Sequence, residues 1–219
     1  MSSETAIPAS SGASKVLLTA AGTPYIPLDT GSSTPIYLTP FFLSDVSTVQ
    51  ATLSDPVLAA QLIAVPQPYT LADAEYWINL QLEGKCNLPL QVLRASDPDA
   101  GQLVGSVSLM PTDSEPLALL RGRLPGLAKN EEKEYELGYY LHPDWTKKGI
   151  MTAGVKALVD WGRKEYSANV VIKVAEENTA SRKIVERMKG FVRDEARDSW
   201  VDVSAPRIRD LPTQKSSKF

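Results

Sequence analysis

Residues 136–158 of the chain have the sequence ELGYYLHPDWTKKGIMTAGVKAL. The first residues of this stretch favour a strand, which ends where a proline follows His142. A short polar loop then leads to Gly149, and apolar residues recur after it at helical spacing. These patterns predict a strand over 136–141, a turn, and a helix over 152–166.

This strand–turn–helix junction is a candidate anion site. A helix N-terminus presents unpaired N–H donors and a partial positive charge. Gly149 lets a phosphate approach the backbone without a Cβ in the way, and Lys147 and Lys148 add attraction. The spacing is not that of a Walker loop, which requires GxxxxGK[ST]. Strand–glycine–helix junctions are common and most bind nothing, so the junction alone does not decide the question.

A second strand–turn–helix follows in residues 170–191, VVIKVAEENTASRKIVERMKGF. The nearly continuous apolar run over 170–175 is typical of a strand buried on both faces. Asn178 is a plausible N-cap for a helix that runs to about Lys189, and Ser181 falls one turn into that helix.

Other signals place further elements before and after these two units. Turn formers, capping residues and apolar periodicity first predict a strand within 35–43 and a short helix capped at Ser44-Asp45. Two more helices are then predicted, one from Asp55-Pro56 to the residue before Pro66 and one from Thr70 to Gly84. After them we expect a hairpin of 88–95 with 103–110, a long loop over 111–134 and, at the end, a last strand near Trp200.

The order of these elements favours one domain. Strands and helices first cluster and then alternate, which is typical of a mixed α/β sandwich around one core. We expect this domain to span 24–205, between a flexible N-terminal tail over 1–23 and a C-terminal tail over 206–219. Gly154 and Gly162 lie on the packing face of the predicted 152–166 helix, which suggests a close approach to the sheet.

Composition excludes several classes of protein. The chain has 219 residues, 43% of them hydrophobic and 22% charged, which is ordinary for a globular protein. The single cysteine, Cys86, rules out an internal disulfide or a cysteine zinc cluster, and we expect it to be a small buried hydrophobe. One histidine rules out a multi-histidine metal site, so we expect no metal. No apolar run approaches the length of a membrane span, and residues 16–18 are too short for a signal-peptide core. We therefore expect an intracellular, soluble protein.

Charge is distributed unevenly along the chain. Residues 146–191 carry ten Lys or Arg against five acids, so this segment holds +5 within a chain whose net charge is −3. A basic segment in an acidic protein fits a local anionic ligand better than a nucleic-acid face, for which a basic domain is expected. Solvated helix faces explain the same charges equally well.

Four stretches, in this order and spacing, resemble the GNAT acetyltransferase superfamily. They are QPYTLADAEYWI (67–78), GYYLHP (138–143), TKKGIMTAG (146–154) and NTASRKIVERMKGF (178–191), within a resemblance that covers roughly 35–203. They are most similar to the branch that acetylates ribosomal-protein N-termini and related amines. The resemblance implies a three-layer sandwich whose central mixed, mostly antiparallel sheet is splayed between two parallel strands.

The resemblance also implies an activity and a site. The activity is direct transfer of an acetyl group from acetyl-CoA, as co-substrate, to a primary amine. Glu136 is the implied general base, and Ser181 the implied donor to the CoA sulfur. The implied cofactor-binding residues are Leu141, His142, Lys147, Lys148, Gly149, Ile150, Met151, Thr152 and Asn178. The implied substrate-binding residues are Tyr76, Trp77 and Tyr139.

The sequence departs from the family pattern at several places. The family loop is usually [RQ]xxGx[GA], but here Thr146 stands first and Met151 last, and Lys147 falls where the branch usually has glycine. Lys189 is an extra residue before the Gly-Phe pair. Many members carry a tyrosine acid four residues after the motif serine, and Val185 occupies that place.

Simpler readings of the same residues remain open. Glu136 fits a solvent-facing strand carboxylate, Ser181 fits local bonding to its helix, and His142 fits a positional role better than that of a base. Aromatic residues on a sheet, such as Tyr139 and its neighbour Tyr140, are usually core.

The function therefore has alternatives. A catalytically silent acyl-CoA-binding module is the second hypothesis, motivated by Lys147, the missing tyrosine and the 111–134 insert, and a plain scaffold domain is the third. For the enzyme, we expect a peptide N-terminus or a small amine as acceptor, no nucleic-acid or membrane partner, a monomer or homodimer, and a cytoplasmic location. The C-terminal Ser217-Lys218-Phe219 resembles the peroxisomal SKL address but has phenylalanine in the last place.

Overall fold

The structure is a computed structural model that describes residues 15–62, 65–84, 88–112, 134–196 and 198–203. Its strands are β1 (Leu17–Leu18), β2 (Pro24–Leu28), β3 (Ile36–Thr39), β4 (Val92–Ala95), β5 (Gln102–Pro111), β6 (Glu134–Leu141), β7 (Asn169–Ile172), β8 (Phe191–Asp194) and β9 (Ser199–Asp202). Its helices are η1 (Leu43–Asp45), α1 (Val46–Leu53), α2 (Pro56–Ala59), α3 (Leu71–Leu82), η2 (Pro143–Trp145), α5 (Ile150–Tyr166) and α6 (Thr179–Arg187). The predictions on Cys86, on most of the 111–134 loop and on the C-terminal tail lie outside the described residues.

The described strands form one sheet, in the order β1-β2-β3-β4-β5-β6-β7-β9-β8. Among them β6 and β7 pair in parallel, and the other neighbours pair antiparallel. The predicted hairpin is the antiparallel pair β4–β5, and the predicted last strand is β9. The fold class is therefore confirmed as a mixed, mostly antiparallel sheet that contains a parallel pair.

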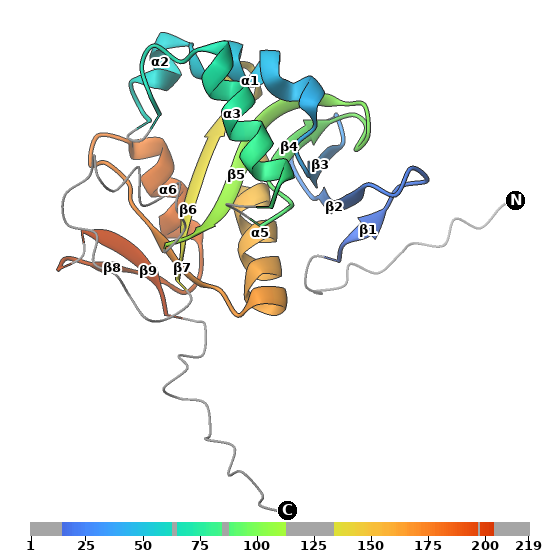
Figure 1. The fold of residues 1–219 in the computed structure, drawn as a ribbon. Helices are drawn as coiled ribbons and strands as arrows, with labels where there is room; N and C mark the ends of the chain where they lie inside the picture. Colours follow the sequence, from blue (N-terminus) through green and yellow to red (C-terminus); the bar gives the residue numbers. More distant parts are fainter. Residues whose placement is uncertain (1–14, 63–64, 85–87, 113–133, 197, 204–219) are drawn as a thin grey trace, which may run out of the picture.

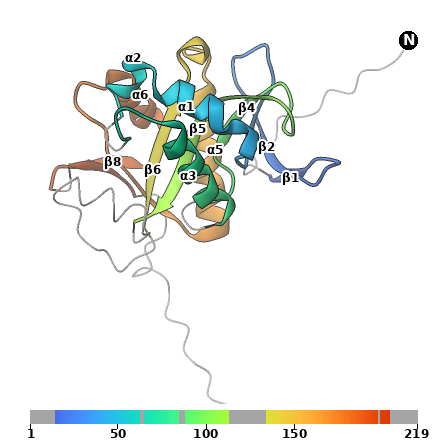
Figure 2. The ribbon, with the colours of Figure 1, turned by 45° about the horizontal axis from the view of Figure 1, so that its top comes forward.

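Helices cover both faces of this sheet (Figures 1 and 2). The helices α1 and α3 lie on one face over a buried cluster, here called the α3-side core, built from Phe41, Val49, Leu53, Tyr69, Ala74, Ile78, Val92 and Leu103. The opposite face packs against α5, and buried Val185 brings α6 to the same side. This second and larger cluster is here called the α5-side core. Burial of apolar surface on both faces holds the three layers together.

The helix α5 lies close against the sheet, as its glycines predicted. A Cβ on Gly154 would lie 2.7 Å from Leu93 Cδ2, and one on Gly162 would lie 2.7 Å from Leu109 Cδ1. The helix begins at Ile150, two residues before the predicted start, because Gly149 takes a left-handed conformation (φ 73°) and serves as its N-cap.

Local capping signals correctly placed two further helices. The side chain of Thr70 accepts a hydrogen bond from the Asp73 N–H at 3.2 Å, and Asp73 bonds back to the Thr70 N–H, so α3 starts with a capping box. Gly84 follows the end of α3 with a φ of +66°. Asn178 caps α6 by accepting from the Ser181 N–H at 3.0 Å.

Two expectations about the first helices were wrong. The helix predicted from Pro56 to residue 65 ends at Ala59, because none of its residues is fully buried and only Leu58 of the helix packs against the α3-side core, so little packing extends it. The other expectation was wrong only in its contact: Asp45 is the N-cap residue of α1, as predicted, but its carboxylate accepts from the Phe42 N–H at 2.8 Å and is buried against Arg94 instead of capping the helix.

Three strands were not predicted. They are β1, β2 and β8. The strand β1 pairs with β2 and lies within 1–23, the range expected to be a flexible tail, whereas β8 pairs with β9 at the other end of the sheet. The strand β1 has only two residues, β2 contains two prolines and β8 ends in the charged residues Arg193 and Asp194, so none of them shows a clear strand pattern.

Candidate functional site

The two edges of β6 have different partners. The N–H of His142 donates to the Val104 carbonyl at 2.8 Å, and the N–H of Thr112 donates to the Glu134 carbonyl at 2.8 Å. Because backbone groups alternate along a strand, the even-numbered residues of β6 bond to β5. The N–H and C=O groups of Tyr139 and Leu141 therefore point toward the β7 side.

On that side the parallel pairing stops early. It runs from Glu134↔Asn169 to Glu136↔Val171, and β7 ends at Ile172 while β6 continues to Leu141. The expected strand over 170–175 is thus shorter than predicted. Within the described part of the chain, no strand pairs with this edge of β6 beyond Glu136, so its backbone groups are available to a ligand.

Side chains of β6 also alternate between the two faces of the sheet. Tyr135 and Leu137 belong to the α5-side core, and Tyr140 packs against the α3-side core. Glu136, which has the same parity as Tyr140, is half-buried and projects toward the α3 layer. The candidate base therefore lies on the face that α3 covers.

Tyr139 lies on the opposite face, beside α6. Its hydroxyl donates to the Ser181 carbonyl oxygen at 3.4 Å. Burial raises its pKa, and the hydrogen bond to Ser181 offsets part of that rise. The structure thus brings Tyr139 together with Ser181 rather than with α3.

Ser181 and Asn178 lie in the first turn of α6, directly after β7. The Asn178 side-chain oxygen is occupied by the Ser181 N–H, which leaves the Asn178 amide hydrogens for a ligand. Among the described residues, the Ser181 hydroxyl has no hydrogen-bond partner, so it is not committed to the helix backbone. Its role as a donor stays a prediction.

The loop before α5 is held by its own side chains. The ammonium of Lys148 donates to the Asp144 carbonyl at 2.9 Å and lies 4.7 Å from the centre of the Trp145 ring. The His142 Nδ1 accepts from the Asp144 N–H at 3.3 Å, which agrees with a positional role for this ring. The Gly31 N–H donates to the Lys148 carbonyl at 3.1 Å and braces the loop from β2–β3.

Lys147 and Gly149 both have left-handed backbone conformations, with φ of 61° and 73°. Lys147 thus keeps the conformation that suits the glycine of related sequences, at a cost of about 1–2 kcal/mol. The helix then opens with Ile150, Met151 and Thr152. The first two side chains are buried, so these residues offer backbone N–H groups to a ligand.

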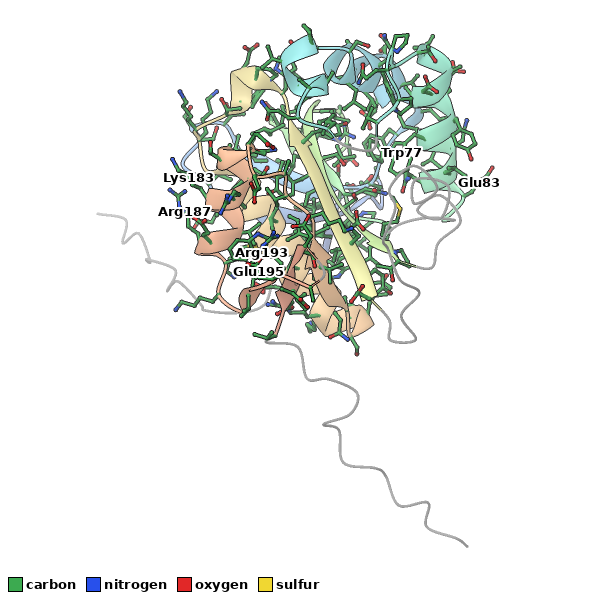
Figure 3. All side chains as sticks on the ribbon, turned by 90° about the vertical axis from the view of Figure 1, so that its left-hand side faces the viewer. Trp77, Glu83, Lys183, Arg187, Arg193 and Glu195 are labelled. Atoms are coloured by element: carbon green, nitrogen blue, oxygen red, sulfur yellow. The ribbon has the colours of Figure 1, made fainter. Side chains whose placement is uncertain are left out.

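The two substrate-binding candidates on α3 differ in position. Trp77 is half-buried on α3 (Figure 3) and packs against the α3-side core, as Tyr140 does. Tyr76 is 59% exposed and lies outside that cluster. The structure therefore brings Trp77, and not Tyr76, to the layer that Glu136 faces.

Sequence reasoning missed a buried polar group beneath α1. Arg94 is 2% exposed, and its guanidinium binds both Asp45 oxygens, at 3.0 and 2.7 Å. It also donates to Thr39 Oγ1 at 3.2 Å and lies 4.4 Å from the centre of the Phe42 ring. The sequence did contain a signal for this pair: Arg94 is the one charged residue in the stretch LPLQVLRA (88–95), and a charge in a buried strand needs a buried partner.

Two tyrosine hydroxyls lie near this ion pair. Burial raises the pKa of Tyr140, and Tyr69 and Asp45 raise it further. Burial and the Asp73 charge raise the pKa of Tyr69 to about 12. Among the described residues the buried Tyr140 hydroxyl has no hydrogen-bond partner. Both groups stay protonated at neutral pH, so neither is suited to act as a base.

Pairing reduces the charge of the basic segment on α5. Lys156, Arg163 and Lys164 pair with acids, Arg163 with Asp202 at 2.6 Å. Lys183 and Arg187 lie exposed along α6 (Figure 3). The positive excess of the segment therefore belongs to the 147–148 loop and to α6.

Two cavities flank the segment 47–62, one beside the residues that follow α2 and the other beside α1. One, of about 270 Å³, is lined by Ala60, Gln61, Leu62, Ala175, Glu177, Asn178, Thr179 and Ala180. The other, of about 320 Å³, is lined by Ser47, Thr48, Ala51, Thr52, Asp55, Gln102 and His142. In the part of the chain that the structure describes, no group of three or more His, Cys, Asp or Glu could hold a metal ion, and no helix is long and apolar enough to cross a membrane.

Comparison with known proteins gives one family match. Residues 36–191 match the family described as Acetyltransferase (GNAT) domain, and no curated protein matches the sequence. Solved structures with similar folds include a GNAT-family acetyltransferase from Bacillus anthracis, with 18% identity and a TM-score of 0.53 over 81% of this chain and 93% of that one. Mycobacterium smegmatis RimJ in complex with CoA-disulfide has 16% identity and a TM-score of 0.54 over 81% and 84%. RimL, a ribosomal L7/L12 alpha-N-protein acetyltransferase, has 16% identity and a TM-score of 0.53 over 86% and 97%.

Proposed function

The chain belongs to the GNAT acetyltransferase family, and on that premise we propose that it transfers an acetyl group from acetyl-CoA directly to a primary amine. The observation that carries this proposal is the parting of the parallel strands β6 and β7 after Glu136, beside the left-handed Gly149 that opens α5. The parted strands leave the backbone edge of β6 open, and the start of α5 at Gly149 presents helix N–H groups.

Acetyl-CoA fits these two features in distinct ways. The amides of residues 147–152 are donors suited to its diphosphate. The free edge of β6 at Tyr139 and Leu141 suits the amides of pantetheine, which would lie beside Leu141 and His142 as an added strand. The His142 N–H already bonds to Val104, so the pairing would use Leu141. The remaining amide hydrogens of Asn178 suit the far end of pantetheine.

The proposed reaction forms an N–C bond and breaks the thioester C–S bond. The acceptor must be unprotonated to attack, and Glu136 would take its proton through a water. The carbonyl oxygen becomes an oxyanion, for which the Leu141 N–H is the donor on the open edge, because the Tyr140 N–H faces β5. The sulfur would leave as a thiolate that accepts a hydrogen bond from the Ser181 hydroxyl and then takes a proton from water.

The acceptor would lie on the α3 side of β6, where Glu136 and Trp77 lie. RimL is named for acetylating a ribosomal protein, and the same class of acceptor, a protein N-terminus, is a candidate here beside small amines. Tyr76 and Tyr139 would not contact the acceptor directly at this place. Tyr76 is exposed, and Tyr139 contacts α6 on the other face of the sheet. A cytoplasmic location and a monomer or homodimer remain proposals.

The test is acetyl-CoA-dependent thiol release with a panel of N-terminal peptides, polyamines and amino acids. We expect release with at least one acceptor, and Glu136→Gln to lower kcat about 100-fold, the scale of general base catalysis. Glu134→Gln, two residues away on the same face of β6, is the matched control and should keep activity. Equal rates for both variants would remove Glu136 from the mechanism.

A silent acyl-CoA-binding module is the second candidate. Val185, at the place of the family tyrosine, is 1% exposed and belongs to the α5-side core, so it presents no acid to the site. Calorimetry that shows CoA binding, together with no turnover of any acceptor in the panel, would favour this candidate over the enzyme.

A further inference from the structure

The cavity between α2 and α6 lies where the two helical layers meet. Leu58 and Leu62, at the α2 end, pack against the α3-side core, whereas α6 packs on the α5 side through Val185. Ala175 also lines the cavity, so the cavity lies past the carboxyl end of β7, where no described strand separates the layers. In open parallel α/β sheets ligands bind at the carboxyl ends of the strands, and β7 belongs to the parallel pair of this sheet.

The turn that lines this cavity has a defined backbone. The Asn178 N–H donates to the Ala175 carbonyl at 3.0 Å, and the Thr179 N–H donates to the Glu177 carbonyl at 2.9 Å. These bonds fix the position of the Glu177 backbone, while its side chain remains exposed. The rest of the lining is small or neutral, with three alanines and Thr179 among it.

Among the described residues that line this cavity, Glu177 is the one that ionises. Within the described part of the chain, no Lys, Arg or His nitrogen lies within 4.0 Å of its carboxylate. A carboxylate repels the phosphates of CoA and gains nothing from the neutral pantetheine. The negative charge of the Glu177 carboxylate is therefore suited to a positively charged ligand group.

We propose that this cavity binds a second, positively charged group of the acceptor, and that Glu177 makes the enzyme prefer acceptors that carry one. The inference rests on the proposed N-acetyltransferase function. The amine that reacts must be neutral, so the charge that pairs with Glu177 belongs to another group. That group can be the distal ammonium of a small amine or a basic side chain close to a peptide N-terminus.

Matched acceptors isolate this second charge. For small amines, the pair is (5-aminopentyl)trimethylammonium and its neutral carbon isostere 6,6-dimethylheptylamine, each with one reactive nitrogen. For peptides, the pair is Ala-Arg-Ala-Ala and Ala-citrulline-Ala-Ala, both with an amidated C-terminus. We expect the full chain to favour the charged member of at least one pair by about two- to five-fold in kcat/KM, the scale of an exposed ion pair. The pair that shows this preference identifies the source of the charge.

Two variants assign the preference to Glu177. Glu177→Gln should abolish it and leave the KM for acetyl-CoA unchanged. Glu176→Gln should keep it, because Glu176 is equally exposed and adjacent to Glu177 but does not line the cavity. The preference should also shrink toward unity in about 0.5 M NaCl, which screens exposed charges.

The outcomes separate the inference from the proposed function. Turnover of both members of each pair at equal rates, or a preference that survives Glu177→Gln, overturns the inference and leaves the acetyltransferase function intact. No turnover of any acceptor overturns the proposed function and the inference with it. Equal melting temperatures of wild type and both variants show that the fold is unchanged.

Discussion

At the scale of single residues, Lys147 shows how the loop before α5 accommodates a departure from the family pattern. Its φ of 61° is one that glycine adopts without strain. Lysine at this position thus adds a positive charge to the loop, and its own backbone is strained in the left-handed conformation. Lys148, next to it, is bound to Asp144 and Trp145, so Lys147 is the more available cation of the two.

Replacing Lys147 by glycine should relieve this strain. We expect Lys147→Gly to raise the free energy of unfolding by about 0.5–1 kcal/mol, since part of the gain is lost to the larger entropy of glycine in the unfolded chain. Lys147→Ala keeps a Cβ and should give no gain. Urea unfolding of the two variants measures the difference, and equal stabilities would contradict the strain.

Arg94 is the second residue with a measurable consequence. Its buried pair with Asp45 ties the start of α1 to β4, across the α3-side face where the acceptor is proposed to lie. Removing one partner of a buried pair leaves the other charge uncompensated.

We expect Arg94→Met to lower the free energy of unfolding by about 3–5 kcal/mol. The double variant Arg94→Met/Asp45→Leu should recover much of this loss, because no unpaired charge remains. As a control, Lys156→Met breaks an exposed pair with Asp160 and should change stability by less than about 1 kcal/mol. A single variant as stable as the wild type would contradict the burial of the pair.

At the scale of elements, the site depends on how closely α5 lies against the sheet. The contact of Gly154 with Leu93 sets the height of the helix, and with it the position of the N–H groups at its start. The same helix carries Gly162 over Leu109, about two turns further along α5.

Gly154→Ala is a test of this contact. In an open helix position alanine would stabilise by about 0.5–1 kcal/mol relative to glycine. Here the new methyl meets Leu93 Cδ2 at 2.7 Å, and overpacking of a core costs about 1–3 kcal/mol. We therefore expect a net loss of about 1 kcal/mol in thermal or urea unfolding. Lys156→Ala on the exposed face of α5 is the control, and a gain in stability for Gly154→Ala would mean that the helix can move away.

At the scale of the whole molecule, buried tyrosines make the stability of the fold depend on alkaline pH. The α3-side core contains Tyr69, whose pKa is raised to about 12, and Tyr140, whose pKa is also raised by burial. The unfolded chain loses a tyrosine proton near pH 10, whereas the folded chain holds the Tyr69 proton up to about pH 12. Stability is therefore complete below pH 10 and falls as pH rises from 10 to 12.

Tyr69→Phe should reduce this alkaline loss. The contribution of Tyr69 is about 2–3 kcal/mol across the interval, from two pKa units. Unfolding free energies at pH 9 and pH 11.5 measure it, and the difference between the two should be smaller in the variant than in the wild type. Tyr76→Phe, in the same layer but exposed, is the control. An identical pH dependence of wild type and Tyr69→Phe would contradict the burial of this hydroxyl.

Much of the fold follows from the amino-acid sequence alone, because it depends on residues close together in the chain. Thr70 and Asn178 cap helices through side-chain bonds to backbone three residues away, and Gly149 opens α5 through its own φ. Apolar periodicity places β5, β6 and α5, and their order indicates a mixed sheet between helical layers. The same local signals indicated the loop at Gly149 as an anion site.

Other features depend on segments far apart in sequence, and only the tertiary structure decided them. Sheet packing places Tyr139 against α6 and Tyr140 under α3, and β7 stops pairing with β6 after Glu136. The partner of Arg94 lies 49 residues away. The cavity with Glu177 exists because α2 and α6, on opposite faces, meet past the end of a strand. Such contacts depend on long-range burial of apolar surface, which no short pattern in the chain specifies.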